Sequence, residues 1–419
     1  MKEYLGKKYV FTILFMAVLY ILAISNFIYS FVELKEWGAE TVHQFKSLEP
    51  ASFMDASNDA VKSLDSTMNE KVKGRYKYIE LFGFYNKVLG KDEHNGFNIV
   101  RDNDGFLFYG NLWSFNRNQD VATAEYARRV YSMQQKLAAK GTDLYVLSMP
   151  VKSMEQELHF DRGIPFQDYS DVADDYIYYC KSYNLDVLDL RNALANSGLK
   201  YEEMFFKTDH HWTPLAGFHA YQYLVEQLKR DGYDLDPTGM YTDMNNYHLE
   251  TYKECWVGSF GIKTGVNYLD ELESITLVVP DYETDFTYSY RYEGDVYFVD
   301  EEGSIEDTLI QRDHIYEQVE GDLYNGSAYS TYMNGICAEE HIVNKKNPNG
   351  PKVLFIRDSY SSTIAPFFAS LCSEVDLIWS KGYGGNIEEL VENNDYDMVF
   401  VATWPENLED DSFNFYTDN

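Results

Sequence analysis

The first apolar run of the chain predicts a membrane span. After Lys2, Glu3, Lys7 and Lys8, no charged residue occurs before Glu33. The roughly 24 intervening residues, at about 1.5 Å per residue, are enough to cross a hydrocarbon core of about 30 Å. The lysines that precede the run predict a cytoplasmic N-terminus and an extracytoplasmic main part. A cleaved signal peptide is the alternative, but the run is long and "LAIS" is a poor cleavage site, so we expect an uncleaved, single-pass signal anchor.

The pattern of apolar and polar residues changes twice along the chain, which predicts three regions. Residues 1–33 form a cytoplasmic stub and the anchor. Residues 34–95 are polar and only loosely helical, and we interpret them as a stem. Residues 96–419 read as an α/β domain with a β-rich insertion at about 233–345, where Tyr, Thr and Val alternate with turn signals.

In the third region, short apolar runs alternate with segments of helical periodicity, after two short strands around Asp104-Gly105. Apolar runs of this length are typical of strands buried on both faces, so the alternation predicts a parallel sheet between two layers of helices. The expected strands are residues 143–150, 185–190, 352–356, 375–379 and 397–403. The expected helices are residues 121–140, 169–183, 214–231, 363–371 and 387–393.

Composition narrows the classes of function. The chain has 35 basic and 68 acidic residues, a formal charge of −33, so it lacks the cationic surface that nucleic acid requires. The cysteines, Cys180, Cys255, Cys337 and Cys372, form no CxxC pair, which argues against a structural zinc site. This spacing is compatible with two disulfides and with four free thiols.

Candidate chemistry lies in two distant stretches. Ser359, in "VLFIRDSYSS", follows a predicted buried strand, and reactive groups collect at the carboxyl ends of parallel strands. A serine hydroxyl needs a base to remove its proton, and a histidine base works best when an acid fixes its tautomer. Asp209 and His211, in a turn held by a helix that begins at Thr213-Pro214, can supply both groups.

Other interpretations of Asp209, His210 and His211 are an ordinary helix-start turn and a metal site. A metal-dependent phosphoesterase of the DHH type would need further aspartate motifs at strand ends, and the sequence has none. We therefore expect neither metal nor cofactor.

The motifs resemble a known group of proteins. "KTDHHWTPLAGFHAY" is similar to the T-D-x-H-W-T motif of the alginate acetylation proteins of the AlgX and AlgJ type, and most of all to the DHHW protein family. "NDGFLFYGN", "LYVLSMPVKSMEQE", "LDVLDLRNAL" and "KVLFIRDSYSSTIAPFF" resemble further elements of these proteins, in the same order, over roughly residues 96–419. The resemblance implies an SGNH-hydrolase-like three-layer α/β/α domain in which the Asp–His pair precedes the serine.

Carried over by position, the resemblance makes Ser359 the nucleophile, His211 the base and Asp209 its orienting acid. The candidate supporting or substrate-binding residues are His210, Lys152, Arg357 and Trp212, and Lys152 could pair with a carboxylate or a sugar. Arg357 departs from the pattern, since glycine is common there. The candidate oxyanion donors are Asn334, Gly335, Gly385 and Asn386.

The implied function is O-acetyl transfer to a cell-surface or exported polysaccharide through an acyl-serine. A multi-span membrane-bound O-acyltransferase would be the partner that delivers the acetyl group across the membrane. A carbohydrate esterase with the same triad and a non-catalytic polysaccharide-binding or scaffold subunit are the alternatives.

Overall fold

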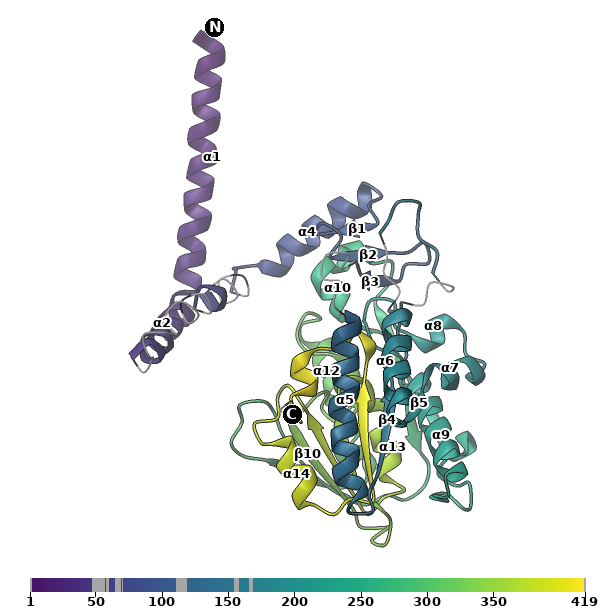
Figure 1. Cartoon of the computed structure of the whole chain (residues 1–419). Coiled ribbons are helices and arrows are strands. Elements are labelled where there is room, and N and C mark those ends of the chain that lie inside the picture. The colour runs from purple at the N-terminus through teal and green to yellow at the C-terminus, as the bar shows by residue number, and fades with distance from the viewer. Residues whose placement is uncertain are drawn as a thin grey trace. The chain divides into compact units, whose positions relative to one another are not determined.

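The computed structural model describes residues 2–46, 57, 60–64, 69, 71–110, 119–153, 158–165 and 169–417 (Figure 1). The chain divides into two units, Met1–Phe82 and Gly83–Asn419. The predicted stem at residues 34–95 falls partly outside the described residues. The remaining part of it holds most of α2 (Phe31–Lys46), and α4 (Arg75–Val88), which crosses the division between the units.

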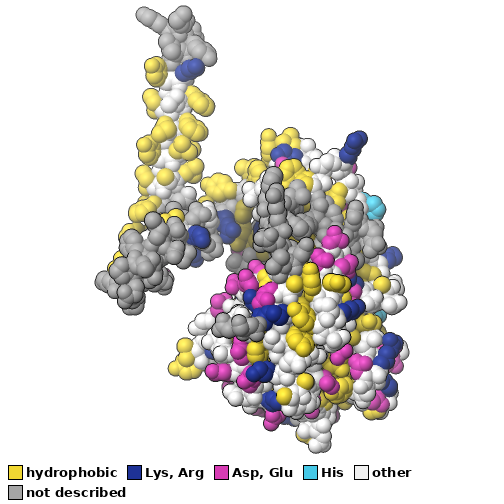
Figure 2. Space-filling model, viewed as in Figure 1, with side chains coloured by type: hydrophobic (Ala, Val, Ile, Leu, Met, Phe, Trp, Pro, Cys, Tyr) yellow, Lys and Arg dark blue, Asp and Glu magenta, His cyan; other side chains and the backbone are white. Residues whose placement is uncertain are grey.

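The N-terminal helix α1 (Lys2–Tyr29) carries the predicted span. Its stretch Lys8–Tyr29 is long and apolar enough to cross a membrane, and no other helix in the described part of the chain meets that condition. Hydrophobic side chains are exposed along residues 9–29 of this helix (Figure 2).

The globular unit is built around an eight-stranded mixed sheet with the order β5-β4-β13-β11-β12-β10-β8-β9. The first five strands in this order are mutually parallel and confirm the predicted sheet, while the last three are antiparallel. The parallel strands are β4 (Asp143–Ser148), β5 (Asp186–Asp189), β11 (Lys352–Arg357), β12 (Glu374–Trp379) and β13 (Met398–Thr403). The antiparallel strands are β8 (Phe286–Arg291), β9 (Val299–Gly303) and β10 (Glu339–Asn344).

Helices cover both faces of this sheet. Successive side chains of a strand point to opposite faces, so Leu354 and Ile356 join one core cluster while Val353 and Phe355 join another. The helices of the first cluster are α5 (Gln119–Ala138), α6 (Ser170–Ser182) and α14 (Ile387–Asn393). Those of the second include α9 (Pro214–Arg230) and α13 (Ala365–Ala369), and both layers are visible in Figure 1.

The predicted β-rich insertion contributes strands to the main sheet. Three of its strands, β8, β9 and β10, extend the main sheet. Two others, β6 (Tyr247–Trp256) and β7 (Glu273–Pro280), form a separate antiparallel pair. The sequence also predicted β5 as fully buried, but β5 is the edge strand of the sheet and is only half-buried.

Shorter elements complete the unit. A small sheet contains β1 (Glu93–His94), β2 (Ile99–Arg101) and β3 (Leu107–Tyr109), with Asp104-Gly105 at the predicted tip. The remaining short helices include α7 (Arg191–Ser197), α8 (Tyr201–Met204), α10 (Ser259–Thr264), α11 (Ile305–Thr308) and α12 (Asp313–Glu320). All four cysteines are free and buried, so no disulfide links these elements.

Candidate active site

Ser359 lies at the carboxyl end of β11, in the middle of the sheet. It is the first residue of the 3-10 helix η6 (Ser359–Thr363), and Asp358 caps this helix. The Asp358 carboxylate accepts hydrogen bonds from the backbone N–H of Tyr360, at 3.0 Å, and of Trp404, at 2.5 Å. Burial raises the pKa of Asp358 to about 6, against the opposing effect of these two donors. The cap therefore ties the serine turn to the end of the neighbouring strand β13.

The turn that holds Asp209 and His211 is closed at its base. Phe205 and Trp212 form an isolated antiparallel bridge, and the Thr213 hydroxyl caps α9 by accepting from Ala216 N at 3.2 Å. Gly217, one turn into α9, allows the helix to approach η6 closely, because a Cβ there would lie 2.2 Å from Thr363 Oγ1. This close approach brings the Asp–His turn to the serine.

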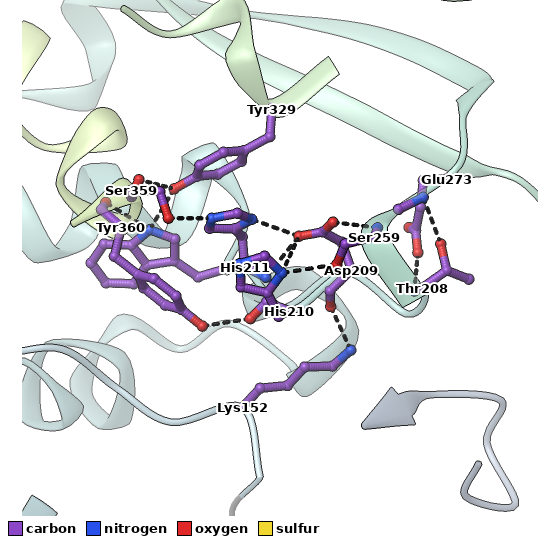
Figure 3. Close-up of polar contacts among 12 residues, drawn as sticks. Lys152, Thr208, Asp209, His210, His211, Ser259, Glu273, Tyr329, Ser359 and Tyr360 are labelled. Carbon is purple, nitrogen blue, oxygen red and sulfur yellow. Dashed lines mark hydrogen bonds and ion pairs between the residues drawn. The ribbon is translucent and has the colours of Figure 1, made fainter. Parts of the chain in front are cut away.

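The three predicted catalytic side chains form one continuous hydrogen-bonded chain (Figure 3). His211 Nε2 lies 2.7 Å from Ser359 Oγ, and His211 Nδ1 lies 2.6 Å from Asp209 Oδ1. Because an ionised carboxylate only accepts, the proton between Asp209 and His211 sits on Nδ1. The Nε2 lone pair then faces the serine hydroxyl, as a general base requires.

Asp209 is held as an ionised acceptor. Besides the imidazole, its Oδ1 accepts from the backbone N–H of His211 at 2.9 Å, and its Oδ2 accepts from Ser259 N at 2.7 Å. Burial would raise the pKa of this carboxyl, but the neighbouring imidazoles and the hydrogen-bond donors hold its pKa well below the usual value. Ser259 belongs to α10, in the predicted insertion, and no motif in the sequence pointed to it.

His210 supports the site from the side. Its Nδ1 lies 2.9 Å from Ser259 Oγ, and its ring contacts those of His211 and Trp404, with centroids 3.8 Å and 5.3 Å away. Burial, together with the neighbouring His211, lowers the pKa of His210 to about 3, although Asp209 opposes this shift. The ring is therefore neutral near pH 7 and places no second positive charge beside the base.

Tyr329 is a site residue that the sequence analysis missed. Its ring stacks on the His211 imidazole, with centroids 3.9 Å apart and an interplanar angle of 15°. Its hydroxyl donates to the Ser359 carbonyl and accepts from Trp212 Nε1, both at 3.2 Å. It lies in a short 3-10 helix, η5 (Ala328–Thr331), without any pattern that marks it as functional.

Lys152 has a different environment from the one predicted. Its Nζ donates to three backbone carbonyls, those of Leu107 at 2.9 Å, Lys207 at 3.1 Å and Asp209 at 2.7 Å. The residue is 2% exposed. Its ammonium is thus saturated inside the protein instead of pairing directly with a carboxylate or facing a sugar, and it fixes the backbone at Asp209. Burial lowers the pKa of Lys152 to about 7, although nearby carboxylates, led by that of Glu273, oppose this.

Arg357, the departure from the family pattern, is buried beneath the serine turn. Its guanidinium forms an ion pair with Glu340, and both side chains are fully buried. The same group donates to the Gly335 carbonyl at 3.2 Å and to Ser362 Oγ at 3.0 Å. The arginine therefore connects η6 to β10 and to the segment around Gly335.

Three of the candidate oxyanion donors, Asn386, Gly335 and Gly385, have other contacts in the structure. Asn386 caps α14, its Oδ1 accepting from Glu389 N at 3.0 Å. Gly335 donates its backbone N–H to the Tyr332 carbonyl at 3.1 Å. Gly385 lies against the Tyr383 ring, and no contact joins it to the triad in the described residues.

Asn334 differs from the other candidates. Its Oδ1 accepts from His314 Nε2 at 2.8 Å, while its buried Nδ2 has no hydrogen-bond partner among the described residues. A single nitrogen of Arg357 contacts both the Gly335 carbonyl and the Asp358 carbonyl, at 3.2 Å and 3.4 Å. The segment of Asn334 and the serine turn are therefore neighbours.

Asp209, His210 and His211 could also be considered as metal ligands, since each offers one ligand atom and these atoms lie within 4.8 Å of one another. Their shortest contacts, however, join Asp209 to His211 and His211 to Ser359. Both nitrogens of His211 are occupied in this way, so a metal would have to displace the hydrogen-bonded chain.

The fold is that of an SGNH hydrolase-like α/β domain, as the motifs predicted. The family model of the SGNH hydrolase-like domain of acetyltransferase AlgX matches residues 99–252. None of the curated proteins matches the sequence. A DHHW family protein from Eubacterium siraeum is similar in structure, with 18% identity and a TM-score of 0.52 over 71% of this chain and 90% of that one.

Bacillus cereus PatB1 is similar as well, with 19% identity and a TM-score of 0.58 over 76% of this chain and 99% of PatB1. A second structure of PatB1, with a sulfonyl adduct, has 17% identity and a TM-score of 0.58, over 76% of this chain and 97% of that one. At these identities the structures establish the fold alone. The match to the AlgX domain supports hydrolase or acyltransferase activity in general terms.

Proposed function

We propose that this protein is a membrane-anchored, extracytoplasmic O-acetyltransferase that modifies a polysaccharide through an acyl-serine at Ser359. The observation that carries the proposal is the continuous Ser359–His211–Asp209 contact, at 2.7 Å and 2.6 Å. The match to the AlgX acetyltransferase domain supports acetyl transfer. The N-terminal helix supports the anchor, and the lysines before it support an extracytoplasmic position of the domain.

In the first half-reaction, Ser359 Oγ attacks the carbonyl carbon of an acetyl ester while His211 Nε2 takes the hydroxyl proton. Asp209 stabilises the resulting imidazolium and keeps its Nδ1–H directed at the carboxylate. The tetrahedral intermediate then loses the donor alcohol, whose oxygen receives the proton from His211. The products are acetyl-Ser359 and the free alcohol.

In the second half-reaction, a sugar hydroxyl attacks the acetyl-serine and gives its proton to His211. Collapse of this intermediate returns the proton to Ser359 Oγ and leaves the acetyl group on the sugar. Water in place of the sugar would release acetate, which is the reaction of the esterase alternative.

Both intermediates carry an oxyanion that needs hydrogen-bond donors. We assign one donor to Asn334, because its Nδ2 has no hydrogen-bond partner among the described residues and its segment adjoins the serine turn; the assignment requires the buried amide to turn toward the substrate. The hydrogen bond from His314 to Oδ1 orients the amide so that Nδ2 faces away from the histidine. The isosteric substitution Asn334→Asp removes the donor, and we expect it to lower kcat by about 10²–10³.

The acetyl donor is a second part of the proposal. A domain tethered outside the membrane needs its acetyl groups delivered there, and a multi-span membrane-bound O-acyltransferase would do so. Co-purification of such a protein with the full chain, from membranes in mild detergent, would support this partner. A full chain that acetylates polysaccharide from a soluble ester alone, at the rate seen in membranes, would contradict it.

The test of the serine is acetyl release from nitrophenyl acetate by the full chain. We expect Ser359→Ala to abolish nitrophenol release and to abolish labelling by a sulfonyl fluoride, whereas Ser361→Ala, two residues along the same turn, should retain both. Equal rates of nitrophenol release by Ser359→Ala and the unmodified protein would refute the assignment of Ser359 as the nucleophile.

A second measurement separates the two acyl acceptors. Addition of a polysaccharide acceptor should shift acetyl from acetate to sugar if the protein is a transferase. Acetate release that is unaffected by any acceptor would identify an esterase.

A further inference from the structure

The helix α4 carries an exposed apolar stripe. Tyr78, Leu81, Tyr85 and Val88 follow one another at spacings of three and four residues, so they share one face of the helix. Their exposed fractions are 51%, 65%, 56% and 66%. Leu89, on the same side, is 52% exposed. So large an apolar stripe on a globular protein marks an interaction surface.

The opposite side of α4 is packed against the globular unit. Gly83 and Asn86 are buried, and a Cβ at Gly83 would lie 2.3 Å from the Thr264 carbonyl of α10. Asn86 Nδ2 lies 3.2 Å from His94 Nδ1. The docked side of the helix therefore fixes the direction in which Tyr85 and Val88 point, which is away from the unit.

The charge of this segment is opposite to that of the chain. Residues 71–91 contain six basic side chains and one acidic one, Glu80, although the whole chain has a net charge of −33. The two lysines Lys73 and Lys77 are exposed. Elsewhere on the visible face of the globular part, acidic side chains are scattered widely (Figure 2). A basic helix with an exposed aromatic and aliphatic stripe is typical of a segment that lies in a membrane interface.

We propose that α4 lies on an anionic lipid surface, with the stripe formed by Tyr78, Leu81, Tyr85 and Val88 at the boundary between headgroups and acyl chains. The inference rests on the anchor of the proposed function, because the span at Lys8–Tyr29 is joined to α4 by residues 30–74 and so tethers this helix to the bilayer. Anionic headgroups attract the basic segment and repel the acidic remainder of the chain, so contact is confined to this helix. The active site is then held near the membrane, where an acyl donor arrives.

The test uses the full chain in lipid vesicles, with a polarity-sensitive fluorophore on a single introduced cysteine. The four native cysteines are buried, so Val88→Cys provides the reactive thiol. Tyr178→Cys, at a position 67% exposed on α6, is the matched control. With phosphatidylglycerol present, we expect a blue shift and quenching by lipid-attached nitroxide at position 88 and neither at position 178.

Two further measurements test whether electrostatic attraction causes the lipid contact. The double variant Lys73→Glu/Lys77→Glu should lose the blue shift and the quenching, as should 1 M salt, because screening shortens the electrostatic range to about 3 Å. Leu81→Cys reports on the same stripe if Val88→Cys folds poorly.

Several outcomes would overturn the proposal. Emission at position 88 that matches position 178 in anionic vesicles would exclude lipid contact. Equal quenching in purely neutral vesicles would exclude the role of charge. A blue shift in crowded vesicles that disappears in nanodiscs with one chain each would make a second copy the occupant. Alkaline carbonate extraction distinguishes failure of the α4 proposal from failure of the anchor. Release of the chain from the membrane would contradict the anchor. A chain that stays in the membrane but carries a solvent-exposed label would contradict only the lipid contact of α4.

Discussion

Replacement of Asp209 by Asn tests whether the three side chains act as one unit. The carboxylate accepts three hydrogen bonds, at 2.6 Å and 2.9 Å from His211 and at 2.7 Å from Ser259 N. An amide has one oxygen. If that oxygen takes the place of Oδ1, the NH₂ group opposes the Ser259 N–H. If the amide is turned, the NH₂ group faces His211 Nδ1 and forces the proton to Nε2, where it blocks the base.

Either orientation also removes the negative charge that stabilises the imidazolium. We therefore expect kcat for nitrophenyl acetate to fall by about 10³–10⁴, which corresponds to about 4–5.5 kcal/mol at 1.36 kcal/mol per tenfold change. KM should change little, since Asp209 is buried and does not reach the substrate. The matched control is Asp281→Asn, which alters an exposed Asp–His pair at 2.7 Å from His248 and should leave kcat unchanged.

Steady-state rates at saturating ester, measured on protein of verified melting temperature, provide the result. A kcat for Asp209→Asn within about tenfold of the unmodified protein would refute the coupling, because a wrong tautomer costs far more. A loss of the same size in Asp281→Asn would show that the assay reports general damage.

The same variant tests the pH dependence of stability. The pKa of Asp209 is lower in the folded protein than in the unfolded chain, so its contribution to stability is complete above the ordinary carboxyl pKa of about 4. The contribution is lost as the pH falls through the folded pKa. We expect the difference in free energy of unfolding between the unmodified protein and Asp209→Asn to be constant from pH 8 to about 5 and to shrink below about pH 4, as measured by urea unfolding. A difference that grows on acidification would contradict this.

Three further substitutions probe the surroundings of the triad. Tyr329→Phe keeps the stacked ring and should retain most activity, whereas Tyr329→Leu should lower kcat about tenfold or more and change the pH profile of kcat/KM, because the ring contacts the His211 imidazole. Arg357→Met leaves Glu340 charged and buried without its partner, so we expect a loss of about 3–5 kcal/mol in urea unfolding, largely recovered by the additional change Glu340→Gln. Lys152→Met leaves three carbonyls without their donor and should lower the melting temperature as well as kcat, whereas a change in KM alone would instead indicate substrate contact.

Local patterns in the sequence determined much of the architecture. The apolar run before Glu33 predicted α1, and the alternation of short apolar runs with helical periodicity predicted the five parallel strands. These features depend on neighbours along the chain, since strand burial and helix periodicity are written in consecutive residues. Thr213-Pro214 marked the start of α9 for the same reason.

The sequence also suggested which groups could react, but not where they lie. Ser359 and His211 are 148 residues apart, and their 2.7 Å contact depends on the close packing of Gly217 against Thr363. Tyr329 and the Ser259 amide approach the imidazole and Asp209 from the segment between the two motifs. No local pattern could indicate them, because a stacked ring and a backbone N–H have no signature in sequence.

The tertiary structure likewise decided the roles of the charged residues. From the sequence alone, Lys152 could face a sugar and Arg357 was a departure from the family pattern. In the structure both are buried: Lys152 holds the backbone at Asp209, and Arg357 holds the serine turn. In α4, periodicity could place Tyr85 and Val88 on one side, but only the docking of Gly83 determined that this side stays open. Sequence periodicity states which residues share a face, whereas the partner of that face is set by long-range packing.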